Sequence, residues 1–491
     1  MSLSRRQFLV GTFGVGAVAG LAACGRATGG IPSTNPSAVA SAEATRTANG
    51  RTRALSLTAR QVQWDLGGRV VSTWAYGDTV PGAGLHATAG DRVRIAFRND
   101  LPSATSVHWH GLAIRNDMDG VPGVTTPEIA AGGSFDYDFT IPDPGTHWFH
   151  PHTGLQLDRG LYAPFIVDDP HENGAYDAEW IIVLDDWTDG VGPSPEDIYA
   201  ALTKDNGSGG GMMGMGSGSG MGSGMMGMDG GDVNYPLYLV NGKAASDPDV
   251  LTAKPGQRVR IRIINASADT IYSVALAGHR LSVTHTDGYP VQPVTTAAIR
   301  IGMGERYDAI TTLHDGIFPL VAEPVGKIGL AHALIRTGKG AAPPSGYRPA
   351  ELDSFPVTAD VLAVAPGHAL PQADPDTTQD IVLSGSMSPY VWTINGNTYD
   401  NTEPLTITHG QTGRFRIRNM SMMPHPLHVH GHTFQVGAAG GTGARKDTIL
   451  VPAMGGVSVD LLGDNPGSWM VHCHNAYHAE AGMMTRLDYT T

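Results

Sequence analysis

The residues best suited to chemistry are histidines that recur in pairs separated by one residue, and a cysteine that lies inside one such pair. The cysteine is Cys473, between His472 and His474. On a β-strand alternate side chains point to opposite faces, so the two imidazoles would point one way and the thiolate the other. Metal ions on both sides would be joined through three consecutive residues. We therefore expect this stretch to carry electrons between two metal sites.

The same rule of alternation sorts the other histidines into two groups. Four pairs can each present two imidazoles to one face: His108 with His110, His150 with His152, His428 with His430, and His472 with His474. Eight imidazoles are enough for a cluster of three metal ions. His425 is three residues before His428, so it faces the other way, with Cys473.

His425 and Cys473, together with His478 and Met483 from the following turn, form a second candidate site. Two imidazoles, a thiolate and a weak thioether are the ligand set of a blue-copper electron-transfer site. Zinc is the competing metal for histidine-rich sites, but zinc has no redox role and would not explain the separate thiolate–thioether site.

An internal repeat indicates which elements position these residues. Gly90, Gly256 and Gly410 each begin an alternating strand that ends in an Asn turn. Histidine clusters follow the first and third copies, whereas the equivalent segment of the second copy, which begins at Tyr272, has none. Repeats at this spacing predict three copies of one β-domain. We expect the metal sites between the first and third domains, with the second as a spacer.

Composition agrees with an all-β chain. The 491 residues include 65 Gly and 33 Pro, and short alternating segments lie between turns. We expect domains near residues 51–168, 178–338 and 350–491. The net charge of −14 disfavours nucleic acid as a partner.

The N-terminus is typical of a signal peptide, residues 1–23. Arg5 and Arg6 precede an apolar run, as in a twin-arginine export signal. Leu21 to Cys24 resembles a lipobox, in which Cys24 would carry lipid; the alternative is an ordinary signal peptide with an incidental cysteine. Residues 24–50 predict a flexible tether. We expect an exported, lipid-anchored protein at the outer face of the cytoplasmic membrane or in the periplasm.

The motifs that contain these ligands resemble the four signature motifs of the multicopper oxidases, from about residue 50 to 491. They are His108-Trp-His110-Gly, His150-Pro-His152, His425-Pro-Leu-His428-Val-His430-Gly and the run from His472 to Met483. The resemblance implies three cupredoxin-like domains, each a Greek-key β-sandwich or barrel, and four copper ions. It implies type-1 copper on His425, Cys473, His478 and Met483, type-2 copper on His108 and His428, and type-3 coppers on His110, His150, His474 and on His152, His430, His472.

The resemblance also implies a reaction. Substrate electrons would enter one at a time at the type-1 copper, pass through Cys473, and reduce O2 to water at the three-copper cluster. Water formation consumes protons. Asp119 matches the family's carboxylate near the cluster, although an Asp before Gly120 is also a turn residue. Glu480 is a second candidate; in some relatives the acid directly follows the last type-1 histidine, which is the place of Ala479 here.

Methionines point to a substrate. Residues 207–228 are rich in Gly and Ser, which predicts a mobile loop in the second domain, and they contain Met212, Met213, Met215, Met221, Met225, Met226 and Met228. Thioethers select Cu(I); the alternative is a low-complexity insertion without ligand function. Met423 matches a methionine that binds substrate copper in periplasmic cuprous oxidases. The aspartate that accompanies it in such relatives is Ser421 here.

These features resemble the copper-resistance branch of the multicopper oxidases, which implies a copper-tolerance oxidase that converts Cu(I) to Cu(II) outside the cytoplasm with O2 as acceptor. Laccase-like activity on phenols or aromatic amines is expected as well. We expect a monomer that meets the membrane only through its N-terminal lipid. One alternative is a laccase for organic, Fe(II) or Mn(II) substrates. Another is a copper-sequestering lipoprotein without turnover.

Overall fold

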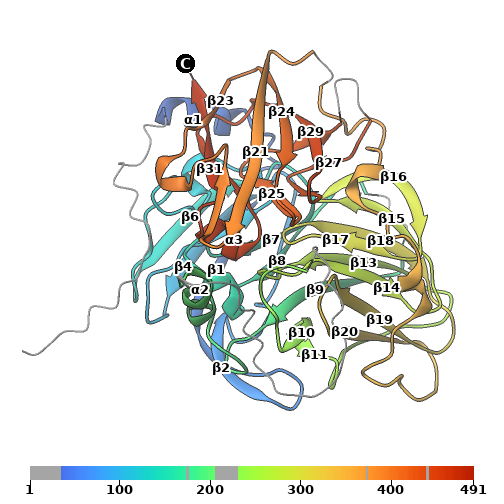
Figure 1. Ribbon diagram of the computed structural model, residues 1–491. Coiled ribbons are helices and arrows are strands. Elements are labelled where there is room, and N and C mark those ends of the chain that lie inside the picture. Colours follow the sequence, from blue (N-terminus) through green and yellow to red (C-terminus); the bar gives the residue numbers. More distant parts are fainter. Residues whose placement is uncertain (1–34, 173–175, 205–229, 372–373, 438–441, 491) are drawn as a thin grey trace, which may run out of the picture.

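In the part of the chain that the structure describes, the regular secondary structure is mostly β-strand, arranged in six sheets (Figure 1). The computed structural model describes residues 35–172, 176–204, 230–371, 374–437 and 442–490. Cys24 and the methionines of residues 207–228 lie outside the described residues. Along the sequence the sheets fall into three successive pairs, and each pair encloses a hydrophobic core.

The first pair of sheets spans residues 52–168. One sheet has the order β2-β1-β4-β6 and the other the order β3-β8-β7-β5. Their strands are β1 (Thr52–Asp65), β2 (Val70–Tyr76), β3 (Leu85–Thr88), β4 (Arg92–Asn99), β5 (His108–His110), β6 (Ser134–Thr140), β7 (Gly145–His150) and β8 (Ala163–Asp168). Strand β4 shows why the alternating pattern folds this way, since its apolar side chains are buried and its arginines are exposed. The 3₁₀ helices are η1 (Asn116–Met118) and η2 (Gln156–Arg159).

The second pair spans residues 178–336. A seven-stranded sheet has the order β11-β10-β9-β13-β18-β15-β16 and a five-stranded sheet the order β12-β20-β19-β14-β17. Their strands are β9 (Ala178–Trp187), β10 (Leu237–Val240), β11 (Lys243–Ala244), β12 (Asp249–Thr252), β13 (Arg258–Asn265), β14 (Tyr272–Leu276), β15 (Leu281–Thr286), β16 (Tyr289–Thr296), β17 (Ile299–Ile301), β18 (Arg306–Thr312), β19 (Ile317–Pro324) and β20 (Ala331–Arg336). Helix α2 (Pro195–Thr203) begins after Ser194, whose hydroxyl accepts a hydrogen bond from the Asp197 amide.

The third pair spans residues 377–490. One sheet has the order β22-β21-β24-β29-β26-β27 and the other β23-β31-β30-β25-β28. Their strands are β21 (Thr377–Met387), β22 (Tyr390–Ile394), β23 (Leu405–Thr408), β24 (Thr412–Asn419), β25 (His425–Val429), β26 (Phe434–Val436), β27 (Arg445–Lys446), β28 (Thr448–Val451), β29 (Gly456–Leu462), β30 (Ser468–Cys473) and β31 (Met484–Thr490). Two 3₁₀ helices, η3 (Ala350–Asp353) and η4 (Ala359–Val361), lie in the segment before β21. The helices within the third pair are η5 (Tyr399–Asn401) and α3 (Ala476–Glu480).

The repeated strands found in the sequence, β4, β13 and β24, occupy the same place in each pair of sheets. Each runs parallel to the first long strand of its unit, β1, β9 or β21, and antiparallel to a later strand. Each ends in an asparagine whose side-chain amide donates hydrogen bonds to carbonyls of the next loop: Asn99, Asn265 and Asn419. These amides fix the loops that lead to β5, β14 and β25.

The segment before β1 differs from the expected flexible tether where the structure describes it. Helix α1 (Pro36–Thr45) buries Val39, and its carboxylate Glu43 accepts a hydrogen bond from the amide of Thr140 in the first unit. Arg46 donates to the side chain of Asn465 in the third unit. Residues 35–50 therefore lie against both outer units. Among the described residues, no helix combines the length and apolar character needed to cross a membrane.

Candidate metal centre

The thiolate site forms where β25 begins, β30 ends and α3 follows. The Nδ1 atoms of His425 and His478 lie 3.0 Å apart, and Cys473 Sγ is 3.6 Å and 3.7 Å from them. All three side chains are fully buried. Their ligand atoms lie within 4.8 Å of one another, close enough to hold one metal ion.

A helix cap and a turn place His478 and Met483 at this site. Asn475 accepts hydrogen bonds from the amides of Tyr477 and His478, which starts α3 directly after the ligand strand. Met483 is buried; its amide donates to the His478 carbonyl and its carbonyl accepts from the Cys473 amide, 2.9 Å and 3.0 Å away. The backbone of Met483 is therefore tied to both Cys473 and His478.

The outer nitrogens of the two imidazoles meet different partners. His425 Nε2 lies 2.7 Å from the hydroxyl of Ser421, whereas His478 Nε2 lies 3.0 Å from a carboxylate oxygen of Asp232. Burial alone would lower the pKa of His478, but the Asp232 carboxylate raises it to about 10. No sequence motif identified Asp232, which lies on a different unit, shortly before β10.

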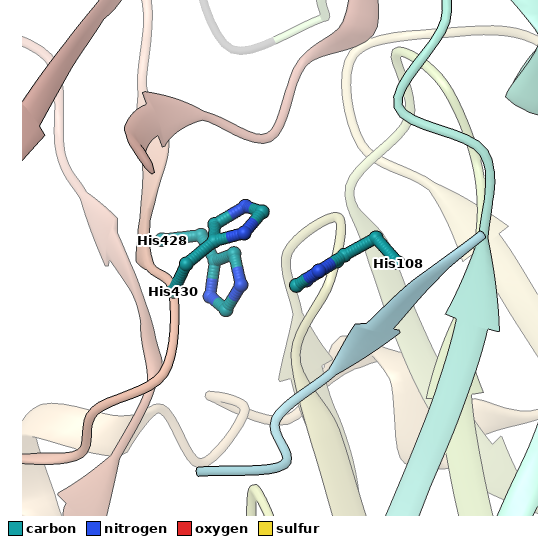
Figure 2. Close-up of side chains that lie close together, drawn as sticks. All are labelled: His108, His428 and His430. Atoms are coloured by element: carbon teal, nitrogen blue, oxygen red, sulfur yellow. The ribbon is translucent and has the colours of Figure 1, made fainter. Parts of the chain in front are cut away.

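The eight paired histidines come together in one cluster between the first and third units. The strand registers pair His108 with His150 and His428 with His472. His108, on β5, points toward His428 and His430 from the opposite side (Figure 2). His152 is partly buried and the other seven are buried. The predicted pairs therefore all face a common centre.

Within this cluster the inward nitrogens approach one another closely. His472 Nε2 lies 3.0 Å from His430 Nε2 and 3.3 Å from His152 Nε2. His474 Nε2 lies 3.2 Å from His110 Nδ1. In each of three groups of histidines, the ligand atoms lie within 4.8 Å of one another. The groups are His108, His428 and His430; His108, His110 and His150; and His152, His430 and His472.

The outward nitrogens are fixed by acceptors, which leaves lone pairs pointing inward. Nδ1 of His108, His150, His428 and His472 each lies within 3.0 Å of a backbone carbonyl oxygen. The Nε2 atoms of His108, His150 and His428 are buried without a hydrogen-bond partner. Buried polar atoms are rarely left unpaired, and metal ions would satisfy these.

Burial also favours the neutral form of most of these imidazoles. It lowers the pKa of His150, His430 and His474 well below the usual range, and the neighbouring imidazoles lower it further. Neutral imidazoles can ligate a metal without first losing a proton. These imidazoles therefore fit copper ions in the cluster, while the two imidazoles, thiolate and thioether of the other site are the ligand types of a blue-copper centre.

Both predicted proton donors lie beside the imidazole cluster. Asp119 is fully buried; its carboxylate is 2.9 Å from His430 Nδ1, and its backbone carbonyl is 3.0 Å from His108 Nδ1. Glu480 lines a cavity of about 100 Å³ whose walls include His152 and His474. Burial raises the pKa of Glu480, which favours the protonated carboxyl group.

The middle unit also reaches the cluster. A Cβ atom on Gly304 would lie 2.8 Å from Cδ2 of His474 and 3.0 Å from Cε1 of His110, so the loop before β18 packs directly on two ligand rings. The prediction that the second domain is only a spacer is therefore wrong. The second domain lacks the paired histidines of the other two, but its backbone and charged side chains still contact the ligands.

Comparison with known proteins decides the family. Three family models, each described as multicopper oxidase, match residues 58–172, 178–340 and 372–491. The chain is also 49% identical, over 491 residues, to the multicopper oxidase MmcO of Mycobacterium tuberculosis, covering 99% of this chain and 96% of that protein. The chain belongs to the multicopper oxidase family.

Two further similarities agree with this assignment. A copper resistance protein A homolog of Pseudomonas syringae pv. tomato is 26% identical over 536 residues, covering 87% of this chain and 90% of that protein. The crystal structure of a multi-copper oxidase from Pseudomonas thermotolerans superposes with a TM-score of 0.69 at 26% identity, covering 89% of this chain and 99% of that chain. The predicted class of oxidoreductase and the all-β cupredoxin-like fold are confirmed.

Proposed function

We propose that this multicopper oxidase oxidises Cu(I) to Cu(II) and passes the electrons to O2, which is reduced to water. The observation that carries the choice of substrate is a set of exposed methionines on two loops that are hydrogen-bonded to each other, one of which contacts the ligand His425. Met420, Met422 and Met454 are 57%, 50% and 58% exposed, so their thioethers are accessible to a metal ion in solution. Thioethers are soft ligands that favour Cu(I).

The loops that carry these methionines are joined to each other and to a ligand. The Met454 amide donates a hydrogen bond to the Ser421 carbonyl, 3.0 Å away. The Ser421 hydroxyl lies 2.7 Å from His425 Nε2, and Met423 follows two residues later. Cu(I) held by this exposed group would lie close to the imidazole of His425. The predicted role of Met423 in substrate binding is retained in this proposal.

The chain provides a short path from this surface to the cluster. His425 Nδ1 lies 3.6 Å from the Cys473 sulfur, and Cys473 is covalently bonded to His472 and His474. Four bound coppers, distributed as the resemblance implies, would supply one-electron transfer at the thiolate site and O2 reduction at the cluster. Asp119 and Glu480 would deliver protons to the cluster from its two sides.

A second substrate class is favoured by Asp232. One oxygen of this carboxylate lies 3.0 Å from His478 Nε2, and the other is buried without a hydrogen-bond partner. The Asp232 side chain is only 1% exposed, so a phenol or aromatic amine would have to displace the atoms that cover it before donating a hydrogen bond to this oxygen and passing its electron to His478. We therefore include laccase-like oxidation of phenols and aromatic amines as a second activity. Thioether ligands do not favour Fe(II) or Mn(II) in the way that they favour Cu(I), so the exposed methionines do not support these ions as substrates.

The location outside the cytoplasm belongs to the same proposal. Export by the twin-arginine route and a lipid on Cys24 are supported by the sequence features alone, and action as a monomer is included as an expectation. Lipid on Cys24 would keep the enzyme at the cell envelope, where Cu(I) could be oxidised before entering the cell. The relationship to a copper resistance protein A homolog supports a role in copper tolerance.

The triple variant Met420→Leu, Met422→Leu and Met454→Leu tests the substrate assignment. Leucine keeps the apolar volume and removes the thioether, so kcat/KM for Cu(I) should fall by about tenfold, the equivalent of ~1.4 kcal/mol of lost binding. Oxidation of a phenol should stay within about twofold. Stopped-flow assays on both substrates make the comparison.

A matched control uses Met387→Leu, an exposed methionine on the separate β21–β22 hairpin. This variant should leave both activities unchanged. A deletion variant lacking residues 207–228 tests whether those seven methionines contribute to Cu(I) oxidation. Unchanged Cu(I) kinetics in the triple variant, or equal losses on both substrates, would refute the proposed methionine site.

A further inference from the structure

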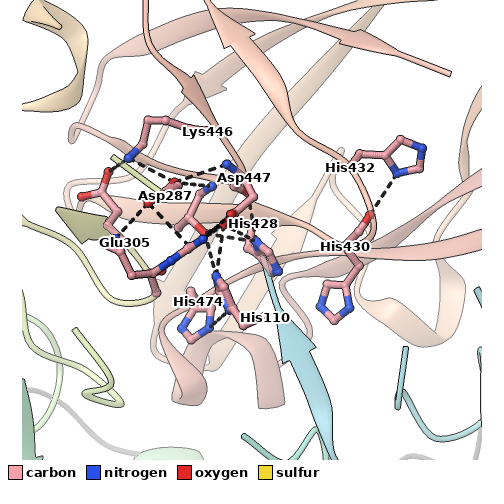
Figure 3. Close-up of polar contacts among 12 residues, drawn as sticks. His110, Asp287, Glu305, His428, His430, His432, Lys446, Asp447 and His474 are labelled. Carbon is pink, nitrogen blue, oxygen red and sulfur yellow. Dashed lines mark hydrogen bonds and ion pairs between the residues drawn. The ribbon is translucent and has the colours of Figure 1, made fainter. Parts of the chain in front are cut away.

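A chain of buried charges runs from the second domain to two ligands of the cluster (Figure 3). It joins Asp287 and Arg306 of the second domain to Lys446 and Asp447 of the third, and all four are fully buried. Burying a charged group is unfavourable unless it is paired with an opposite charge. These four side chains must therefore keep a specific arrangement in which each charge has a partner. The chain ends at His110, on β5 of the first domain.

Asp447 determines which nitrogen each of two ligands presents. Its carboxylate oxygen Oδ1 lies 3.1 Å from His110 Nε2, and its backbone carbonyl lies 2.9 Å from His428 Nδ1. Carboxylate and carbonyl oxygens only accept hydrogen bonds, so these ring nitrogens carry the proton. His110 is left with a lone pair on Nδ1 and His428 with one on Nε2. Both of these atoms face the cluster.

Arg306 holds Asp447 in this orientation. Its Nη1 and Nη2 donate to the two carboxylate oxygens of Asp447 at 2.8 Å and 2.6 Å, a bidentate pair. Its Nε donates to the carbonyl of Thr146 in the first domain, and Nη1 also donates to the Gly304 carbonyl in the second. One guanidinium therefore binds all three domains at the point where the cluster forms.

Asp287 fixes the backbone of the same segment. One carboxylate oxygen accepts hydrogen bonds from the amides of Asp447 and Thr448, 3.2 Å and 3.1 Å away. The other accepts from the amide of Arg306 at 2.9 Å. The carbonyl of Asp447 that orients His428 is thus held from the second domain as well.

The glycine of the motif His108-Trp-His110-Gly111 accommodates this contact. Gly111 has a φ of +84°, and a Cβ atom there would lie 2.3 Å from Arg306 Nη2 and 2.9 Å from Asp447 Oδ2. Only glycine leaves room for the guanidinium directly after the ligand His110. The close packing at Gly111, next to the ligand His110, is therefore required for the ion pair between Arg306 and Asp447.

We propose that Arg306, from the domain without ligands, is a positioning residue of the copper cluster. It holds Asp447 so that His110 and His428, one ligand from each outer domain, present the correct nitrogens. This inference rests on the proposed copper cluster. It differs from a purely stabilising ion pair because loss of Arg306 should disturb the cluster selectively and leave the thiolate site intact.

The test is Arg306→Lys in the full-length, copper-loaded enzyme. Lysine keeps the charge and loses the bidentate fork. We expect the variant to lose one or more of four coppers, to show altered type-2 electron paramagnetic resonance, and to keep the blue absorption of the Cys473 site. Turnover should fall by about 10- to 100-fold, as for other residues that orient metal ligands.

The matched control is Arg260→Lys. Arg260 is also buried on the second domain and pairs with Asp308 at 2.6 Å and with Glu172, but neither carboxylate contacts a histidine of the cluster, whereas Asp447 contacts His110. It should keep four coppers and normal spectra. If Arg306→Lys does not fold, Arg306→Gln replaces it, because the glutamine amide can still donate to one carboxylate oxygen. The same measurements and the same expected results apply to this variant.

Two results would overturn the inference. An Arg306→Lys enzyme with four coppers, unchanged resonance and turnover within twofold would show that Arg306 does not position the cluster. Equal loss of the blue absorption and of the cluster signals would indicate a general packing defect. A wild-type enzyme that fails to bind four coppers or consume O2 would instead count against the proposed function.

Discussion

Replacing Cys473 by serine is expected to remove the blue absorption and to lower turnover by more than about a thousandfold. Serine is a weak ligand for copper, whereas the thiolate supplies both a strong ligand and the covalent path to His472 and His474. The Cys473 sulfur lies between the two imidazoles of its site, 3.6 Å and 3.7 Å from their Nδ1 atoms. No other thiol is present among the described residues.

The fold should survive this change. Serine is smaller than cysteine, and the Cys473 amide keeps its hydrogen bond to the Met483 carbonyl. Circular dichroism, copper analysis and O2 uptake should show a folded protein that keeps the three cluster coppers and has no measurable oxidase activity. Full activity in the serine variant would mean that electrons reach the cluster by a different route.

Replacing Asp119 by asparagine is expected to lower turnover by about 10²- to 10⁴-fold. The carboxylate accepts a hydrogen bond from His430 Nδ1, 2.9 Å away, which leaves the His430 Nε2 lone pair facing His472. An asparagine amide would present an N–H group or a weaker acceptor in its place, and it cannot release a proton to the cluster. The variant thus loses ligand orientation and proton supply together.

Asp117→Asn provides a matched control two residues away. Asp117 is about half exposed and pairs with Arg115 on the surface, so its variant should keep turnover within about twofold. Copper content and steady-state O2 uptake are measured for both variants. An Asp119→Asn enzyme as active as the Asp117→Asn enzyme would exclude Asp119 from the reaction.

The metal ligands could be predicted from sequence because strand geometry is local. His472 lies on β30 and His474 directly follows its last residue, Cys473, so the alternation of strand side chains places the two imidazoles on one side and the sulfur on the other. The register of β5 with β7 joins the histidines of the first domain, and that of β25 with β30 joins those of the third. The packing of the two domains then completes the cluster. The internal repeat further predicted that the first and third domains supply these ligands.

The residues that hold the ligands could not be predicted in this way. Asp232 and Arg306 come from the second domain, and their contacts with His478 and Asp447 span 246 and 141 residues. Such contacts depend on how the domains pack, which no spacing rule records. The absence of histidines in the second domain hid its contribution to the site.

Helix α1 carried a local signal that the composition concealed. Asn35 caps the helix by accepting hydrogen bonds from the amides of Ser37 and Ala38, and Pro36 occupies the first turn. Alanine, the best helix former, recurs in the segment that follows. Small residues had suggested a tether, whereas cap, proline and alanines together indicate a helix.

The central claim is that Cu(I) oxidation is coupled to the four-electron reduction of O2. It is tested most directly by the stoichiometry of the copper-loaded wild-type enzyme, with an O2 electrode and a Cu(I) chelator assay run on the same sample. Four Cu(I) ions should be oxidised for each O2 consumed, without hydrogen peroxide. A copper-loaded protein that consumes no O2 when Cu(I) is added would contradict the claim and would favour copper sequestration.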